Sequence, residues 1–326
     1  MKRLPDSAGM TAGPGGGRWL LLPVLLLFLS ARGAPGTAAA ARASFPLVLK
    51  DGRGVAVQLA SAPRRVVSLA PNLTEIVFLL GQEERLVGVT RYCNDPPGAA
   101  LLPRVGGIVD PDVERIVAAA PDLVLCTTDG NPRERIRVLE EMGIPCFAAG
   151  PQNLAAVFET IEKIGEILGV PERGRKEANA LRARAERVSR EKRSPSPRVL
   201  LVVSTSPVIA AGNGTFLDEI VRIAGGRNAA ATFAGRYPRL SVEDLIIAAP
   251  DVILVAAMSG VEEFSPDVTR WGEVPAFREG DVFSLDGDLV TRPGPRMVAA
   301  LERVDEVLSA WRKRHPRAGG PGRATR

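Results

Sequence analysis

Apolar and polar residues follow one another along this chain in an order that occurs twice. Residues 113–125, VERIVAAAPDLVL, return 129 positions later as 242–254, VEDLIIAAPDVIL, with seven of thirteen residues identical. In each copy the pattern predicts a short helix with a glutamate in its first turn, a proline that ends it, and an apolar strand. Helix-to-strand units of this kind build open parallel sheets. The chain is therefore predicted to be an α/β protein that contains one structural unit twice.

A second pair of segments supports this interpretation. Residues 63–81 and 196–225 each predict a strand, a loop and a helix that ends at a glycine, the usual helix stop. Their matching glutamates, Glu75 and Glu219, are 144 positions apart, so the two copies differ in loop length. The sequence predicts two doubly wound parallel-sheet lobes, at residues 63–152 and 196–312.

Between the two predicted lobes, residues 153–195 have a helical pattern. Apolar residues recur at helical spacing in the first part, and Arg, Lys, Glu and Ala dominate the second part, as on a solvated helix surface. The pattern predicts one long helix or two abutting helices, which would restrict the lobes to modest closure. Ahead of the first lobe, residues 44–62 predict a hairpin around Asp51 and Gly52.

The N-terminal segment, residues 1–43, has the features of a secretory signal peptide. Lys2, Arg3 and Arg18 precede an apolar run, and small residues with A-x-A spacing follow near Ala40. A membrane anchor would need about 20 apolar residues, and this run is much shorter. We therefore expect an exported, soluble mature chain that is not inserted in a membrane.

The positive net charge is concentrated at the two ends of the chain. The whole sequence has a net charge of +5, of which residues 1–43 carry +4 and residues 312–326 carry +6, which leaves about −5 for the rest. Nucleic-acid binding requires basic residues clustered on a folded face, so this class of partner is not expected. Residues 313–326 are predicted to form a disordered basic tail.

Few residues suit catalysis or direct metal binding. The single histidine, His315, lies in the predicted tail, and neither a nucleotide-binding glycine pattern nor G-x-S-x-G occurs. An enzyme would have to use Asp95, Asp286 and Asp288. We expect no catalytic residue, no metal site and no intrinsic cofactor, so any metal would arrive inside a chelate. The chain is predicted to be a receptor for a small molecule.

All three cysteines of the chain, Cys93, Cys126 and Cys146, fall in the first predicted lobe. An oxidising compartment would allow two of them to pair and leave one free. Buried free thiols that act as small apolar residues are an equal alternative. The sequence leaves both arrangements open.

Six stretches carry a more specific resemblance. Together they resemble the periplasmic binding proteins for vitamin B12, ferric siderophores and haem that serve ABC importers, over residues 48–311. The resemblance implies a periplasmic location and two lobes joined by a single long rigid helix, with the ligand in the cleft between them. In chain order the stretches are RVVSLAPNLTEI (65–76), VGVTRYCNDPP (87–97), RVGG (104–107), residues 113–125, LSVED (240–244) and RPGPR (292–296).

The resemblance also gives the repeated glutamates a role. In that family, glutamates at matching positions dock onto arginines of the two permease subunits, which implies docking by Glu114 and Glu243. Helix chemistry offers an alternative, because an acidic residue in the first turn, after Asp112 or Ser241 as cap, complements the helix dipole by about 0.3–1 kcal/mol. The two interpretations are compatible, since a charge at a helix start is easily presented to a partner.

Ligands of open α/β sheets bind at the loops that follow the strands. Tyr92 and Tyr237 match aromatic positions of B12-binding relatives, and flat rings suit a macrocycle, although either ring could instead pack a loop. Phe216, Phe233 and Trp271 are expected in cores or loop packing. The candidate ligand residues are Asn72, Tyr92, Gly107, Ile108, Thr127, Tyr237, Asp286, Asp288 and Arg292.

Departures from the family pattern set the order of expected ligands. Ile108 and Thr127 stand where B12-binding relatives carry tryptophans, and Gly107 stands where haem binders tend to carry a tyrosine. The sequence ranks cobalamin or a related corrinoid first, a ferric siderophore second and haem third. A monomer is expected, and a sensor without a permease partner is kept as an alternative. The cations that would suit an anionic siderophore are Arg91, Arg236, Arg239 and Arg292.

Overall fold

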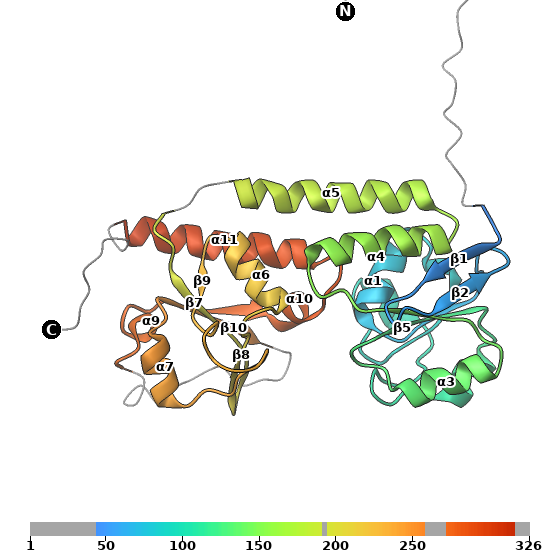
Figure 1. Cartoon of the computed structure of the whole chain (residues 1–326), viewed down its shortest axis with the longest axis horizontal. Helices are drawn as coiled ribbons and strands as arrows, with labels where there is room; N and C mark the ends of the chain where they lie inside the picture. The colour runs from blue at the N-terminus through green and yellow to red at the C-terminus, as the bar shows by residue number, and fades with distance from the viewer. Residues whose placement is uncertain (1–43, 191–193, 258–271, 317–326) are drawn as a thin grey trace, which may run out of the picture. The chain divides into compact units, whose positions relative to one another are not determined.

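The computed structural model describes residues 44–190, 194–257 and 272–316 (Figure 1). The predicted signal peptide, Trp271 and residues 317–326 of the predicted tail lie outside these ranges. Within them, we find no helix with the length and apolar character needed to cross a membrane. The described residues form a small two-stranded sheet and two larger β-sheets with helices packed on them, one larger sheet in an N-terminal half, residues 44–190, and one in a C-terminal half, residues 194–316.

The N-terminal half contains a four-stranded sheet in the order β4-β3-β5-β6, and all its strand pairs are parallel. The central strands β3 and β5 are mostly apolar, each with one polar residue at its end, and almost entirely buried, as expected for a parallel sheet covered on both faces. An antiparallel hairpin of β1 and β2 precedes the sheet. The strands are β1 Leu47–Lys50, β2 Ala56–Leu59, β3 Val66–Ser68, β4 Leu86–Val89, β5 Leu123–Thr127 and β6 Cys146–Ala149.

The C-terminal sheet has the order β11-β10-β7-β8, and β9 also pairs with β7. The pairs of β7, β9, β10 and β11 are parallel, which confirms the predicted α/β class with two parallel sheets. Strand β8 is antiparallel to β7, because two residues separate them and so short a link can only form a hairpin. The strands are β7 Arg198–Thr205, β8 Val208–Ala210, β9 Arg227–Asn228, β10 Val252–Ala257 and β11 Val282–Asp286.

The two copies of the repeat, helices α2 and α7, share the same type of N-cap and the same backbone conformation after the helix. Asp112 caps α2 and Ser241 caps α7, each by accepting a hydrogen bond from a backbone N–H of the first turn. Both segments then reach an alanine with positive φ, Ala120 at 43° and Ala249 at 40°, directly before a proline. The helices that cover the two sheets are α1 Pro71–Leu79, α2 Val113–Ala118, α3 Arg133–Glu141, α6 Phe216–Ile223, α7 Val242–Ala248, α9 Pro275–Arg278 and α10 Gly287–Thr291, with short 3-10 turns at Glu83–Arg85 and Pro97–Leu101.

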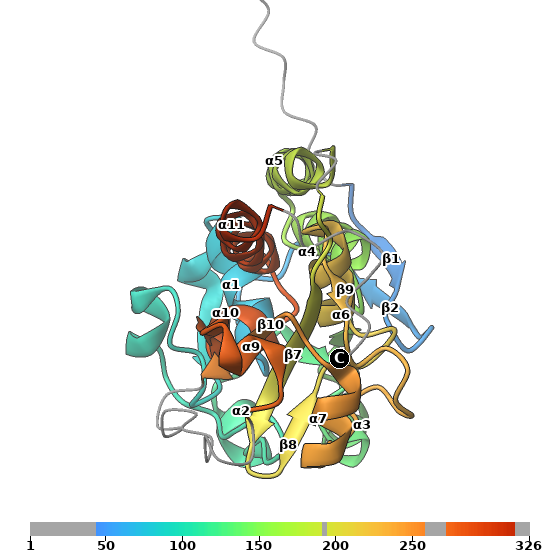
Figure 2. The same ribbon diagram turned by 90° about the vertical axis from the view of Figure 1, so that its left-hand side faces the viewer.

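The segment after β6 forms two abutting helices, α4 (Leu154–Ile167) and α5 (Pro171–Arg190). Gly169, with φ at +75°, ends the first, and Pro171 fits the first turn of the second. Helix α5 leads to the second sheet and packs on both α4 and the last helix, α11 (Met297–Arg314). Figures 1 and 2 show α5 outermost, with α4 and α11 between it and the sheets. The long helix that joins the halves is thus α5, which spans 20 residues.

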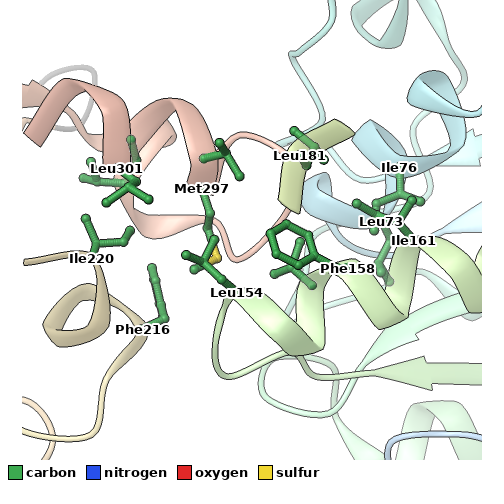
Figure 3. Packing of buried hydrophobic residues seen from close by; sticks show 14 of the residues in the cluster. Leu73, Ile76, Leu154, Phe158, Ile161, Leu181, Phe216, Ile220, Met297 and Leu301 are labelled. Carbon is green, nitrogen blue, oxygen red and sulfur yellow. The ribbon is translucent and has the colours of Figure 1, made fainter. Parts of the chain in front are cut away.

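One apolar core runs through both halves without a break. It contains Leu73, Ile76 and Ile161 in the N-terminal half and Ile220 and Leu301 in the C-terminal half, all fully buried. Figure 3 shows the junction, where side chains of α4, α6 and α11 lie close together. The junction residues are Leu154, Phe158, Phe216 and Met297.

The end of α11 differs from the prediction for the basic tail. Residues 313 and 314 complete the helix, and the ring of His315 stacks on Trp311 with 4.7 Å between ring centroids. Arg314 pairs with the buried carboxylate of Asp281, and Nε2 of His315 lies 3.5 Å from the same group. The expectation that residues 313–315 are disordered is therefore wrong, because these partners are far away in the sequence.

Two glycines let α4 and α5 touch backbone to backbone. A Cβ on Gly165 would lie 2.9 Å from Cα of Gly174, closer than such contacts occur. We expect Gly165→Val to lower the free energy of unfolding by about 1–3 kcal/mol, because the helices would have to move apart. Urea denaturation followed by circular dichroism measures the change. Ala183→Val, on the exposed face of α5, is the matched control, and an equal loss in both variants would contradict the close-packing explanation.

Candidate functional site

A cavity of about 560 Å³ lies where the loops after the strands of both sheets meet. Its position follows the general rule that open α/β sheets bind ligands at the carboxyl ends of their strands. Seven of the nine predicted ligand residues line it: Asn72, Tyr92, Ile108, Thr127, Tyr237, Asp288 and Arg292. Further lining residues that the sequence did not assign to the ligand include Asp129, Gln152, Phe216, Thr291 and Pro293.

The N-terminal wall of the cavity is organised by Asn131, a buried residue that sequence reasoning missed. Its side-chain oxygen accepts a hydrogen bond from the N–H of Thr127 at 2.7 Å. Its amide nitrogen donates to the carbonyls of Leu69 at 3.1 Å and Ile108 at 2.8 Å. One side chain therefore fixes three loops, and the only sequence signal for it was its place shortly after a predicted strand.

Both tyrosines of the sequence line the cavity, one from each half. Tyr92 follows β4 and is 48% exposed, and Tyr237 is 46% exposed. The guanidinium group of Arg91 lies 5.6 Å from the centre of the Tyr92 ring. Burial raises the pKa of Tyr237, so its phenol stays neutral at physiological pH. The cavity thus offers two half-exposed aromatic rings to a ligand.

Two polar bridges cross between the halves at the cavity wall. In the first, Arg292 pairs with Asp288 at 2.7 Å and donates to the side-chain oxygen of Asn94 at 2.8 Å. In the second, Arg236 donates to Gln152 at 2.7 Å, and Gln152 donates to Asp129. Arg236 makes no ion pair with any residue that the structure describes. It is therefore the cavity cation available to an anionic ligand.

The structure does not bring Gly107 and Asp286 to the cavity wall. Gly107 lies beside the ion pair of Arg91 and Asp110, and a Cβ at this position would require these two side chains to shift. Asp286 is the cap of α10 and accepts hydrogen bonds from the N–H groups of Asp288 and Leu289. The nearest lining residues are Ile108 and Asp288, one and two positions further along the chain.

Glu114 and Glu243 occupy matching exposed positions in the first turns of α2 and α7. Neither carboxylate forms an ion pair with a residue in the described ranges. Capping is done by their neighbours, Asp112 in α2 and Ser241 with Asp244 in α7. Figure 2 shows both helices on the side of the molecule away from α5. The glutamates are therefore free to meet a partner.

The cysteines contribute neither a disulfide nor a metal site. Cys93, Cys126 and Cys146 are buried free thiols, which matches the alternative of small apolar residues. Burial raises the pKa of Cys126 to about 12 and also raises that of Cys146. Across the described parts of the chain, no three His, Cys, Asp or Glu side chains gather in a way that could hold a metal ion.

Three of the known proteins that resemble this chain cover most of its length. A vitamin B12-binding protein of Vibrio vulnificus (strain CMCP6) is 29% identical over 258 residues, which are 78% of this chain and 93% of that protein. The crystal structure of the periplasmic vitamin B12 binding protein BtuF of Vibrio cholerae matches with a TM-score of 0.69 and 29% identity, over 77% of this chain and 99% of that one. The periplasmic haem-binding protein RhuT from Roseiflexus sp. RS-1 matches with a TM-score of 0.67 and 31% identity, over 76% and 98%. The sequence profile of a family described as periplasmic binding protein matches residues 66–289.

Proposed function

Because the chain belongs to the periplasmic binding protein family, we propose that it is exported to the periplasm, holds a small metal chelate between its halves and delivers it to an ABC permease. The observation that carries this proposal is the cavity, which both tyrosines of the sequence line from opposite halves. Its volume of about 560 Å³ lies within the range of small-molecule sites. The protein acts as a monomer and contributes no cofactor of its own.

The acidic residues near the cavity favour binding over catalysis. Asp286 caps α10, Asp288 pairs with Arg292 at 2.7 Å, and Asp95 lies 3.4 Å from Arg296. These are the three acids that an enzyme on this fold would have to use. Each of them already has a structural partner, so none is set apart as a general acid or base.

Cobalamin or a related corrinoid is the ligand that we place first. The rings of Tyr92 and Tyr237 are half-exposed in the cavity, and flat aromatic faces suit a macrocycle. Two of the similar proteins are named for vitamin B12. A ferric siderophore is the second candidate, because Arg236 has no carboxylate partner in the described ranges and would attract an anionic chelate. Haem is third.

Docking onto the permease is assigned to Glu114 and Glu243. Apolar side chains lie one turn further along both helices and are exposed to solvent: Val117 on α2, and Ile246 and Ile247 on α7, the last 75% exposed. An exposed acidic residue beside exposed apolar ones suits a protein partner that supplies arginines and an apolar surface. The repetition of this surface on both halves suits a permease made of two subunits.

Calorimetric titration of residues 44–326 with cyanocobalamin tests the proposed ligand. Saturable one-to-one binding with a Kd of about 1 μM or below, roughly −8 kcal/mol or better, would establish the corrinoid. Ferric siderophores and haemin are titrated into the same preparation. Binding of a ferric chelate alone would keep the transport role and change the ligand, whereas no binding of any of these chelates would contradict the proposal.

Tyr92→Ala is expected to weaken ligand binding by about 1–3 kcal/mol, the usual effect of losing a well-packed aromatic contact. Tyr92→Phe keeps the ring and should bind as the wild type does. Calorimetry with the ligand identified above measures both variants. Equal affinities of the alanine variant and the wild type would return Tyr92 to the alternative role of loop packing.

A further inference from the structure

A cluster of charged residues joins the two halves next to the cavity. It consists of three carboxylates and two guanidinium groups, Glu75, Asp95 and Asp288 with Arg292 and Arg296, and is called the Glu75 cluster below. Glu75 lies on α1 in the N-terminal half, whereas both arginines belong to the C-terminal half. Oε1 of Glu75 is 3.0 Å from Arg296 and 3.8 Å from Arg292.

The charges of the Glu75 cluster do not balance when every group is ionised. Each arginine has a second carboxylate partner, Asp288 for Arg292 at 2.7 Å and Asp95 for Arg296 at 3.4 Å. Three negative charges therefore share two positive ones. A single proton on the cluster would make it neutral.

Glu75 is the member of the cluster that is best placed to hold this proton. It is 5% exposed, and its second oxygen, Oε2, has no hydrogen-bond partner among the described residues. An ionised carboxylate with one oxygen buried and unpartnered is costly, whereas a protonated one is tolerated. Burial raises the pKa of Glu75 to about 7 and Asp95 adds to this, while Arg296 and Arg292 act in the opposite direction.

The other surroundings of Glu75 carry no compensating charge. The α1 side chains that face α4 are apolar, as the contact of Leu73 and Ile76 with Ile161 shows (Figure 3). Strand β3, which packs against the same helix, contains Val and Ser only. The titratable groups that act on Glu75 are Arg296, Arg292 and Asp95, all members of the cluster.

The cluster reaches the ligand through residues of the cavity wall. Arg292 and Asp288 belong to both, and Asn72, on the same helix as Glu75, donates a hydrogen bond to the carbonyl of Pro293 at 2.9 Å. Glu75 itself does not line the cavity. Its charge can therefore reach the ligand site through the contact between the halves.

We propose that Glu75 is a proton-linked positioning residue, which is protonated when the two halves are in contact. Ionisation of its carboxyl group draws the side chain toward water. This movement loosens the contact that holds Arg292 and Pro293 on the cavity wall. The proposal rests on the binding function proposed above. Ligand binding, which uses this wall, then becomes weaker as the pH rises through neutrality. Below neutrality the cluster is neutral and the wall is fixed.

Titration with cyanocobalamin across the neutral pH range tests the proposal. We expect the affinity of the wild type to fall by about tenfold between about pH 6 and about pH 8, a typical coupling between two linked sites. Glu75→Gln carries a neutral group of the same shape and should bind tightly at every pH. Glu84→Gln, at an exposed position, should follow the wild type. Parallel pH profiles of Glu75→Gln and the wild type would overturn the proposal.

Asp95→Asn provides a second variant that does not depend on Glu75→Gln folding correctly. Removing one of the three carboxylates balances the cluster with Glu75 ionised, so the pKa of Glu75 should fall. The pH at which affinity declines should then move to lower values than in the wild type. An unchanged midpoint would contradict the role of charge balance.

A measurement without ligand separates this proposal from the ligand assignment. In carbon-13 NMR, the carboxyl signal of Glu75 is identified as the one that the spectrum of Glu75→Gln lacks. In the wild type this signal should titrate near pH 7. Because the folded chain holds a proton that the unfolded chain releases, the wild type should lose stability relative to Glu75→Gln as the pH rises toward 7. If both results hold and cyanocobalamin does not bind, the ligand is wrong and Glu75 keeps its role. An ordinary carboxyl titration would reject that role, whatever the ligand.

Discussion

Replacing Glu114 and Glu243 together by alanine is expected to abolish uptake of the ligand while leaving its affinity for the purified protein within a few-fold. Both side chains are exposed on helices that do not line the cavity. The proposed docking gives each glutamate one charge contact with the permease, so the double change is expected to remove both contacts, each of which typically contributes about 2–5 kcal/mol when buried in a complex. Uptake by proteoliposomes that contain the permease and its ATPase measures the loss, and calorimetry measures the affinity.

The matched control for this experiment is Glu134→Ala. Glu134 is also an exposed glutamate in the first turn of a helix, α3, but it is not part of the repeat. Its loss should reduce helix stability as much as either single change and leave uptake intact. Normal uptake in the double variant would show that the glutamates only complement their helix dipoles. An equal loss of uptake in Glu134→Ala would point to a general effect of surface charge.

Gly294→Val is expected to weaken ligand binding by at least about tenfold and to lower the free energy of unfolding by about 1–3 kcal/mol. Gly294 lies where the C-terminal half approaches α1. A Cβ at this position would be 2.8 Å from Cβ and 3.3 Å from Cα of Asn72. The backbone of α1 cannot move aside, because it is packed in the core. The halves would separate and break the hydrogen bond between Asn72 and Pro293, which is 2.9 Å long.

Ala310→Val, on the exposed face of α11, adds a similar volume away from this contact and serves as the control. The series Gly294→Ala, Gly294→Ser and Gly294→Val should show losses that grow with side-chain size. Calorimetry measures the ligand affinity of each variant, and urea denaturation measures its free energy of unfolding. A wild-type affinity for Gly294→Val would mean that the close approach of the halves does not shape the cavity.

The repeated part of the fold could be predicted from the sequence because its signals are local. Prolines after each helix, glycines at helix ends and the matched glutamates all lie within the segments that they define. The antiparallel β8 and the ordered end of α11 depend on contacts with distant residues. His315, for example, lies beside Asp281, more than thirty positions earlier. No local pattern reveals such a contact.

The site was predictable to a similar extent and for the same reason. Strand-end loops placed seven of the nine ligand candidates on the cavity wall, including Tyr92 and Tyr237. Asn131 and Gln152 were missed, because their roles consist of bonds between loops that the sequence does not align. Glu75 was noticed only as a mark of the repeat. Its partner Arg296 is 221 positions away, so its burial and charge could be assessed only in three dimensions.

The core that runs unbroken through both halves limits what the repeat can do alone. A chain cut between α5 and β7 would leave Leu154 and Phe158 of one fragment, and Phe216 and Met297 of the other, facing solvent. Each fragment would then expose an apolar surface, and we expect it to aggregate rather than fold. The two copies of the structural unit are thus no longer modules that evolution could exchange or discard separately. Neither copy is expected to be stable without the other, because each completes the core of its neighbour.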